Sequence, residues 1–75
     1  MSDFEVASII ELVGESEKSW EDAVSRAVDE AAKTVKHIQG VEVLNMTAVV
    51  EQGKVVKYKA DCHVSFGVDD GLRDL

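Results

Sequence analysis

The feature that most constrains the fold is the regular alternation of side chains between Val55 and Val68. The even-numbered positions are all apolar: Val56, Tyr58, Ala60, Cys62, Val64, Phe66 and Val68. The odd-numbered positions between them include Lys57, Lys59 and Asp61. This period of two predicts a β-strand with one buried face and one solvent-exposed face. A helix is a poor alternative, because helical spacing would place lysine and aspartate in the core.

The length of this strand indicates that the chain works as a homo-oligomer. At about 3.3 Å per residue the strand would span about 45 Å, whereas a compact domain of this size has a radius of gyration of about 11 Å. The strand must therefore curl strongly or extend onto a neighbouring subunit. Residues 1–75 form a single domain, and a chain this short is only marginally stable unless it is cross-linked or assembled. Because Cys62 is the only cysteine, an internal disulfide is excluded.

Composition narrows the classes of function. The net charge of −7 argues against nucleic acid and against anionic membranes as partners, since both attract basic patches. The apolar run from Val6 to Val13 is too short to span a bilayer. A lone cysteine is typical of a reducing compartment, so we expect a cytoplasmic protein. We expect no enzyme, because the sequence has no nucleophile–base–acid set and no glycine-rich phosphate loop.

The first half of the chain predicts a strand and a helix. The strand covers Val6 to Val13 and ends at Gly14, and a polar loop follows. Ser19 is the expected N-cap, with Asp22 in the capping-box position. The helix then runs for about 19 residues to a stop at Gly40. Its apolar stripe consists of Trp20, Ala23, Val24, Ala27, Val28, Ala31, Val35 and Ile38.

The second half predicts a hairpin. A strand from Val41 to Val50 changes parity between Val43 and Leu44, which indicates a bulge. A short turn over residues 51–53 leads into the long strand, and residues 69–75 form a tail that we expect to be flexible. The order β-α-β-β predicts an α+β fold in which a three-stranded antiparallel sheet wraps around one helix. The two edges of such a sheet invite pairing with other chains.

Several stretches of the sequence resemble the dodecin family. They are the run from Glu11 to Ala23, the segments Lys33-Thr34-Val35 and Val41-Glu42-Val43, the turn Gly53-Lys54-Val55 with Tyr58, and Val64-Ser65-Phe66. The likeness extends from about Ile9 to Asp69. It implies a β-α-β-β subunit in a hollow homododecamer. It also implies that flavins such as FMN or riboflavin bind near subunit contacts, for storage and photoprotection and not for catalysis.

The resemblance implies a flavin site at Gln39, Gly40, Val41, Asn45 and Lys59. Typical members have a tryptophan that stacks on the flavin where this chain has Gly40, and a glutamine that bonds the flavin edge where it has Lys59. The lost aromatic contact costs about 0.5–1.5 kcal/mol beyond the buried area. We therefore expect weaker flavin binding. Lys59 is instead suited to meet a phosphate or another anion as a point charge.

Other residues leave alternatives open. Glu42, Glu51 and Asp61 are candidates to bind a hard cation such as calcium, with ligands pooled across subunits, as some relatives without the flavin clamp are described to do. The alternatives are a solvated acidic surface and a purely structural assembly. His37 and His63 lack the spacing of a metal site.

Three apolar side chains complete the set of candidates. Trp20 is either a ligand platform or a core or interface residue, and the apolar stripe on which it lies favours the second. Cys62 and Met46 are expected in the core.

Overall fold

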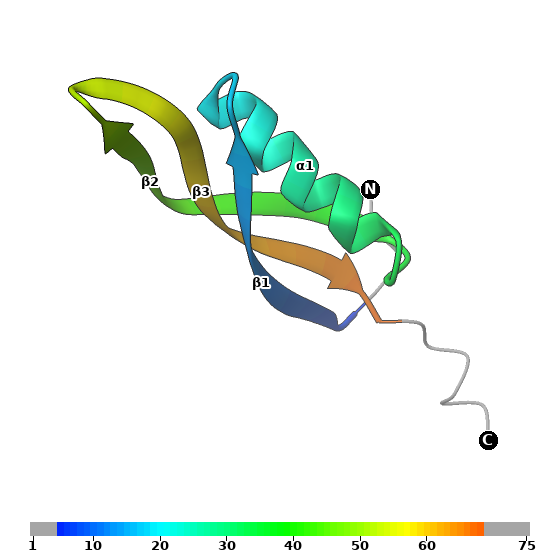
Figure 1. Cartoon of the computed structure of the whole chain (residues 1–75). Helices are drawn as coiled ribbons and strands as arrows, with labels where there is room; N and C mark the ends of the chain where they lie inside the picture. The colour runs from blue at the N-terminus through cyan, green and yellow to red at the C-terminus, as the bar shows by residue number, and fades with distance from the viewer. Residues whose placement is uncertain (1–4, 69–75) are drawn as a thin grey trace.

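The protein folds as a three-stranded sheet with one helix on one face. The computed structural model describes residues 5–68. Its elements are β1 (Ala7–Ser16), α1 (Trp20–Ala32), β2 (Ile38–Glu51) and β3 (Lys54–Gly67). The strands are antiparallel in the order β1-β3-β2, and α1 packs against one face of the sheet (Figure 1). This confirms the predicted α+β fold with β-α-β-β order. The expected tail over residues 69–75 lies outside the described residues.

The long alternating strand is the centre of the sheet. β3 pairs with β1 on one side and with β2 on the other. Its even-numbered residues Ala60, Cys62 and Val64 are fully buried beneath α1. The odd-numbered residues point to the outer face, by which we mean the sheet face turned away from α1. The predicted division into a buried and a wet face is therefore confirmed over the middle of the strand.

The helix begins where the sequence predicts and ends earlier. The Ser19 hydroxyl accepts a 2.9 Å hydrogen bond from the backbone N–H of Asp22, as expected for an N-cap. The expected stop at Gly40 is wrong, because α1 ends at Ala32. The N–H groups of the next turn fold back onto the carbonyl of Ala31. His37 then adopts a left-handed backbone with φ of 65°, which turns the chain into β2.

The helix packs through its smallest residues. Ala23, Ala27 and Ala31 are the buried residues of α1. Gly14, which we expected to end the first strand, lies inside β1 instead. A Cβ atom on Gly14 would overlap the carbonyl oxygen of Ala23. The glycine therefore allows the helix to approach the strand closely, and β1 continues past it to Ser16.

β2 is irregular, and a tight turn joins it to β3. Its register shifts between Ile38 and Gly40, between Val43 and Asn45, and again near the end of the strand. The second shift confirms the predicted bulge. At the turn, Gln52 and Gly53 have φ values of 52° and 77°. Two central residues with positive φ are the signature of a type I′ turn, the usual connection in two-residue hairpins.

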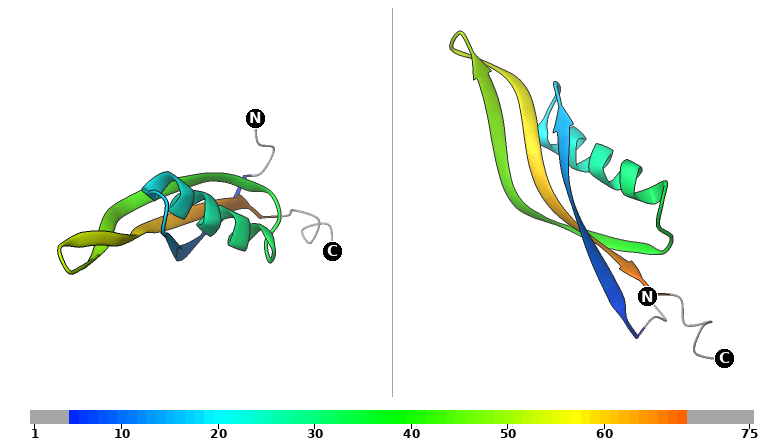
Figure 2. Two further views of the ribbon diagram at one scale, coloured as in Figure 1. Left: turned by 45° about the horizontal axis from the view of Figure 1, so that its top comes forward. Right: turned by 60° about the horizontal axis from the view of Figure 1, so that its bottom comes forward.

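Part of the sheet has no cover. Beyond the end of β1, residues 49–57 of the hairpin continue as a two-stranded arm (Figure 2). The radius of gyration is 15.3 Å and the longest extent is 59 Å, against about 11 Å for the radius of a compact domain of this length. A two-stranded ribbon alone is marginally stable in water. The arm therefore needs a surface on which to pack.

The uncovered part of β2 is apolar. Val41, Val43 and Met46 pair directly with the buried residues of β3, so their side chains point to the same side as α1. The helix lies over β1 and β3, however, and these three side chains are 39%, 40% and 57% exposed. The expectation that Met46 is a core residue is therefore wrong for the single chain. We call these three residues the β2 strip.

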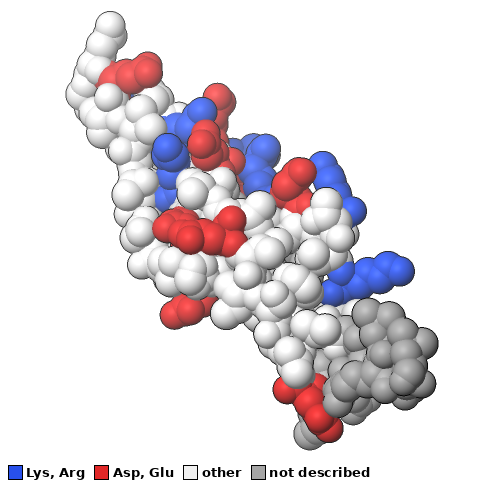
Figure 3. Space-filling view, turned by 90° about the horizontal axis from the view of Figure 1, so that it is seen from below, with Lys and Arg blue, Asp and Glu red and all other residues white. Residues whose placement is uncertain are grey.

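Charges of both signs are distributed over the surface. Figure 3 shows acidic and basic side chains intermingled on one face, with no continuous basic patch in that view. No helix in residues 5–68 is long and apolar enough to cross a bilayer.

Candidate functional site

The residues implied as a flavin site lie on β2 and β3 but do not converge in one chain. Gly40 pairs with Ser65, and Lys59 pairs with Thr47. Ser65 and Lys59 are six residues apart on β3, which corresponds to about 20 Å along the strand. Gln39 lies at the first register shift of β2, and Val41 belongs to the β2 strip, on the helix side. One chain therefore supplies two separate parts of a site.

The surroundings of Gly40 are open. The hydroxyl of Ser65 donates a 3.3 Å hydrogen bond to the carbonyl oxygen of Gly40. A Cβ atom built on Gly40 would meet the Ser65 Oγ at 3.6 Å, which is an ordinary contact distance. A methyl group therefore fits here without moving the backbone. As the chain stands, this position has no ring to stack on a ligand.

Asn45 faces Asp61 across the second bulge. Both side chains lie on the outer face, since the two residues are directly paired. The Oδ1 atom of Asp61 is buried and has no hydrogen-bond partner within the described chain. A buried carboxylate oxygen without a partner carries an uncompensated desolvation cost. Asp61 is thus the residue of the outer face that is best placed to gain from a bound cation or from a donor on another chain.

Lys59 already has a carboxylate beside it. Glu15 lies directly opposite Lys59 on β1. Its carboxylate is 3.1 Å from the Nζ of Lys57 and 4.0 Å from the Nζ of Lys59. All three side chains are between 38% and 47% exposed, so these ion pairs are weak. One carboxylate therefore balances two lysines, and the group retains one positive charge.

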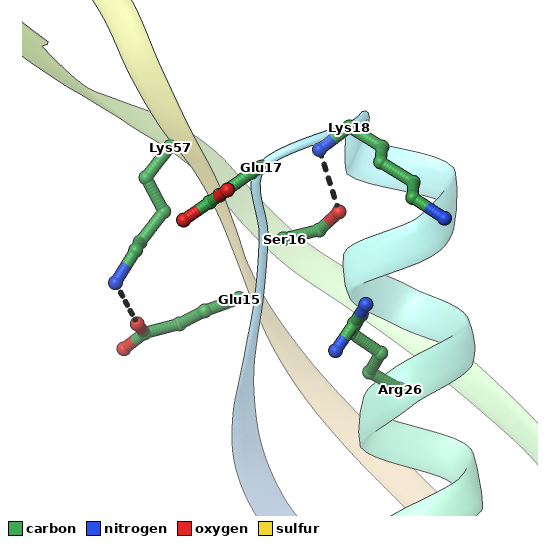
Figure 4. A pocket seen from close by; sticks show the side chains of 6 residues that line it. All are labelled: Glu15, Ser16, Glu17, Lys18, Arg26 and Lys57. Atoms are coloured by element: carbon green, nitrogen blue, oxygen red, sulfur yellow. Dashed lines mark hydrogen bonds and ion pairs between the residues drawn. The ribbon is translucent and has the colours of Figure 1, made fainter.

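A cavity of about 310 Å³ opens at the end of β1, beside the turn into α1 (Figure 4). Its lining residues are Glu15, Ser16, Glu17, Lys18, Arg26 and Lys57. We call it the turn cavity. From the sequence we expect only a polar loop in this segment. No signal in the sequence could have found the cavity, because Lys18, Arg26 and Lys57 are far apart along the chain.

Buried Ser16 connects the end of β1 to the start of α1 beside the turn cavity. This residue is only 4% exposed. Its hydroxyl donates to Asp22 Oδ2 at 2.6 Å and accepts from the backbone N–H of Lys18 at 2.9 Å. Arg26 Nε donates to the same Asp22 oxygen at 2.8 Å. The Ser16 hydrogen bond, followed by that from Arg26, lowers the pKa of Asp22 below its usual 3.8, and Asp22 in turn raises the pKa of Arg26.

The other cation candidates are dispersed. Glu42 pairs with His63 in the middle of the sheet, whereas Glu51 pairs with Lys54 at the hairpin tip. The Nε2 atom of His63 lies 3.6 Å from a carboxylate oxygen of Glu11. Within residues 5–68, no group of three or more His, Cys, Asp or Glu side chains is arranged to hold a metal ion. A metal site would therefore require ligands from more than one chain.

The aromatic and thiol candidates have structural surroundings. Trp20 packs edge-on against Tyr58, with ring centroids 4.8 Å apart, and it is 37% exposed. Cys62 is a free, fully buried thiol, and burial raises its pKa. Both agree with the interpretation of these residues as packing side chains.

Comparison with known proteins gives one consistent result. The dodecin family profile matches residues 6–69. The dodecin of Thermus thermophilus is 31% identical over 61 residues, which cover 81% of this chain and 88% of that protein. The calcium dodecin of Mycobacterium tuberculosis is also 31% identical over 61 residues, covering 81% of this chain and 86% of the relative. The structure of dodecin from Streptomyces coelicolor superposes with a TM-score of 0.83 at 26% identity, covering 92% of this chain and 97% of the other.

Proposed function

This chain belongs to the dodecin family, and we propose that it forms a homododecamer that stores a small ligand between its copies. Members of this family are non-enzymatic small-ligand-binding proteins. The observation that carries this proposal is the β2 strip. Val41, Val43 and Met46 are on the helix side of the sheet, yet they remain 39%, 40% and 57% exposed in the described chain. Exposed apolar surface of this kind is typical of an interface.

Assembly also explains the divided ligand site. Gly40 and Lys59 both lie on the outer face but about 20 Å apart along the sheet. A ligand that contacts both a Gly40 and a Lys59 would have to bind where two or more copies of the chain meet. Such a pocket exists only in the oligomer, so binding and assembly are linked. The buried thiol of Cys62 is consistent with a reducing compartment, and we propose a cytoplasmic location.

We propose flavin, as FMN or riboflavin, as the ligand. The opening beside Gly40 supports this, because the nearest atom to a side chain at this position is the Ser65 hydroxyl. Gln39 and Asn45 supply polar groups along the same strand, whereas Val41 points to the helix side of the sheet. The chain offers no aromatic side chain at position 40, so the affinity should be lower than in a chain that has one.

Flavin fluorescence provides the test. We expect the protein to quench the fluorescence of added FMN or riboflavin, and Gly40→Trp to tighten binding by about two- to tenfold. Gly40→Leu is the matched control, since it adds apolar volume without a stacking surface. If the wild-type protein and both variants leave flavin fluorescence unchanged at micromolar concentration, flavin is not the ligand.

The second candidate ligand is a hard cation such as calcium. The specific observation in its favour is the unpartnered Oδ1 of Asp61, opposite the amide side chain of Asn45. Carboxylate and amide oxygens are calcium ligands, and the calcium dodecin of Mycobacterium tuberculosis is as similar to this chain as the Thermus protein is.

A thermal-shift comparison separates the two ligands. If calcium binds, it should raise the melting temperature of the wild-type protein more than magnesium does. Asp61→Asn should remove that difference, whereas Asp29→Asn, on the helix surface, should keep it. Equal effects of the two metals on the wild-type protein would exclude a calcium site.

A further inference from the structure

Ile9 places an apolar side chain on the outer face of the sheet, in line with Gly40. It lies directly opposite Ser65 of β3, and Ser65 lies directly opposite Gly40 of β2. Directly paired residues point to the same side of a sheet, so these three residues form one row across the outer face. Ile9 is 59% exposed in the described chain. Its side chain is therefore accessible to a ligand that lies over Gly40.

The row has a width that suits a flat ring system. Neighbouring strands are about 4.8 Å apart, so Gly40 and Ile9 are separated by about 10 Å across β3. This separation is comparable to the long dimension of three fused six-membered rings. The β2 end of the row is open, because the nearest atom to a Cβ on Gly40 is the Ser65 Oγ at 3.6 Å.

The middle of the row makes little polar demand on a ligand. The hydroxyl of Ser65 already donates a 3.3 Å hydrogen bond to the carbonyl oxygen of Gly40. A ring that covers this hydroxyl therefore does not have to supply an acceptor in order to avoid the cost of an unsatisfied donor. The largest apolar surface that the row offers to such a ring is the side chain of Ile9.

The next row of the outer face is charged. Glu11 and Glu42 lie on either side of His63, and the Nε2 atom of His63 is 3.6 Å from a carboxylate oxygen of Glu11. Covering charged groups with an apolar ring carries a desolvation cost. This cost favours a ring position over Ile9 and Ser65 and disfavours a position further along the sheet.

We propose that Ile9 is a ligand-contacting residue that supplies, from β1, the apolar surface that position 40 lacks. This inference rests on the proposed binding of flavin at Gly40, and it adds a third strand to that site. The contact is made with the ring system and not with the chain attached to it. Ile9 should therefore influence the affinity for every ligand that carries the ring, with or without a ribityl chain.

Fluorescence titration with riboflavin and with lumichrome, a related tricyclic ring system without the ribityl chain, tests the proposal on the assembled protein. We expect Ile9→Thr to weaken the binding of both compounds by about three- to tenfold, because part of a buried apolar group is lost. Threonine keeps the branched β-carbon that suits a strand. Ile9→Leu retains the apolar surface and should bind both compounds within about twofold of the wild-type protein.

Val13→Thr is the matched control. Val13 lies on the same strand and face and is 53% exposed, but it is opposite Asp61 and not in the row of Gly40. This variant should bind both compounds as the wild-type protein does. Native mass spectrometry of each variant checks that the assembly is retained.

Several results would overturn the role of Ile9 alone. They are equal effects of Ile9→Thr and Val13→Thr, an effect on riboflavin without one on lumichrome, and dissociation of the assembly by Ile9→Thr, which would make Ile9 an interface residue. If the wild-type protein binds neither compound, the proposed flavin function fails as well. The two failures are thus told apart by the wild-type titration.

Discussion

The indole N–H of Trp20 donates a 2.8 Å hydrogen bond to the backbone carbonyl of Thr47. The first residue of α1 is thus tied to β2, the strand that the helix covers least. The same ring meets Tyr58 of β3 edge-on, with an interplanar angle of 73°. One side chain therefore connects the helix to two strands, close to the point where the two-stranded arm begins.

We expect Trp20→Phe to lower the free energy of unfolding by about 1 kcal/mol. Phenylalanine retains a ring against Tyr58 but loses the N–H donor, and a typical hydrogen bond contributes about that amount. Thr47→Ala is the control, because the accepting carbonyl belongs to the backbone and remains. Urea unfolding at fixed protein concentration measures both. Equal destabilisation by the two variants would show that the hydrogen bond contributes nothing.

Gly14 and Gly40 should respond in opposite ways to the addition of one methyl group. Gly14→Ala places a Cβ against the backbone carbonyl of Ala23, so the helix must move off the strand. Overpacking of this kind costs about 3 kcal/mol. Gly40→Ala makes only an ordinary contact with Ser65 and should be nearly neutral. Thermal denaturation of the two variants checks the difference, and a stable Gly14→Ala protein would contradict the close packing described here.

The lowered pKa of Asp22 predicts a specific acid sensitivity. The Ser16 hydroxyl and Arg26 favour the charged carboxylate in the folded chain. Its stabilising contribution is therefore present at pH values above the usual pKa of 3.8. It is lost as the pH falls through the lower folded value. Asp22→Asn should melt at a lower temperature than the wild-type protein near neutral pH, and this difference should shrink on acidification.

Glu21→Gln is the control for that experiment. It removes a neighbouring charge from the same first turn of α1 without breaking the bonds to Ser16 and Arg26. Melting temperatures between about pH 6 and about pH 2 give the comparison. A difference between Asp22→Asn and the wild-type protein that stays constant over this range would refute the assigned cause.

Cys62 should be unreactive in the folded protein. The thiol is fully buried in the sheet, and burial raises its pKa, so little thiolate is present at neutral pH. We expect alkylation by iodoacetamide to be slow in buffer and complete in concentrated urea. Mass spectrometry counts the adducts. Rapid labelling without urea would mean that β3 opens frequently.

The local patterns of the sequence predicted the centre of the fold. The alternation around Cys62 is imposed by burial on one side of β3, and a period of two has no other simple explanation. Ser19 and Asp22 predicted the helix start because an N-cap acts within a single turn. The change of parity after Val43 predicted the bulge for the same local reason. None of these features requires knowledge of which strands are neighbours.

The errors arise where a tertiary contact decides the outcome. Gly14 was expected to end a strand, but its role depends on Ala23, a residue of another element. The apolar stripe continued past Ala32 to Ile38, so the sequence alone could not show that pairing of Ile38 with Phe66 would prevail over helix formation. Ser16 and Arg26 meet only because β1 and α1 pack together, and therefore the turn cavity had no signal in a linear reading.

Native mass spectrometry at micromolar concentration tests the central claim most directly, namely that the β2 strip and the arm are covered by other copies of the chain. One chain has a mass of 8.2 kDa, and we predict a single dominant species of about 98 kDa, which corresponds to twelve copies. Met46→Glu, which places a charge in the β2 strip, should shift the distribution to smaller species. A folded wild-type monomer at 8.2 kDa would contradict the account.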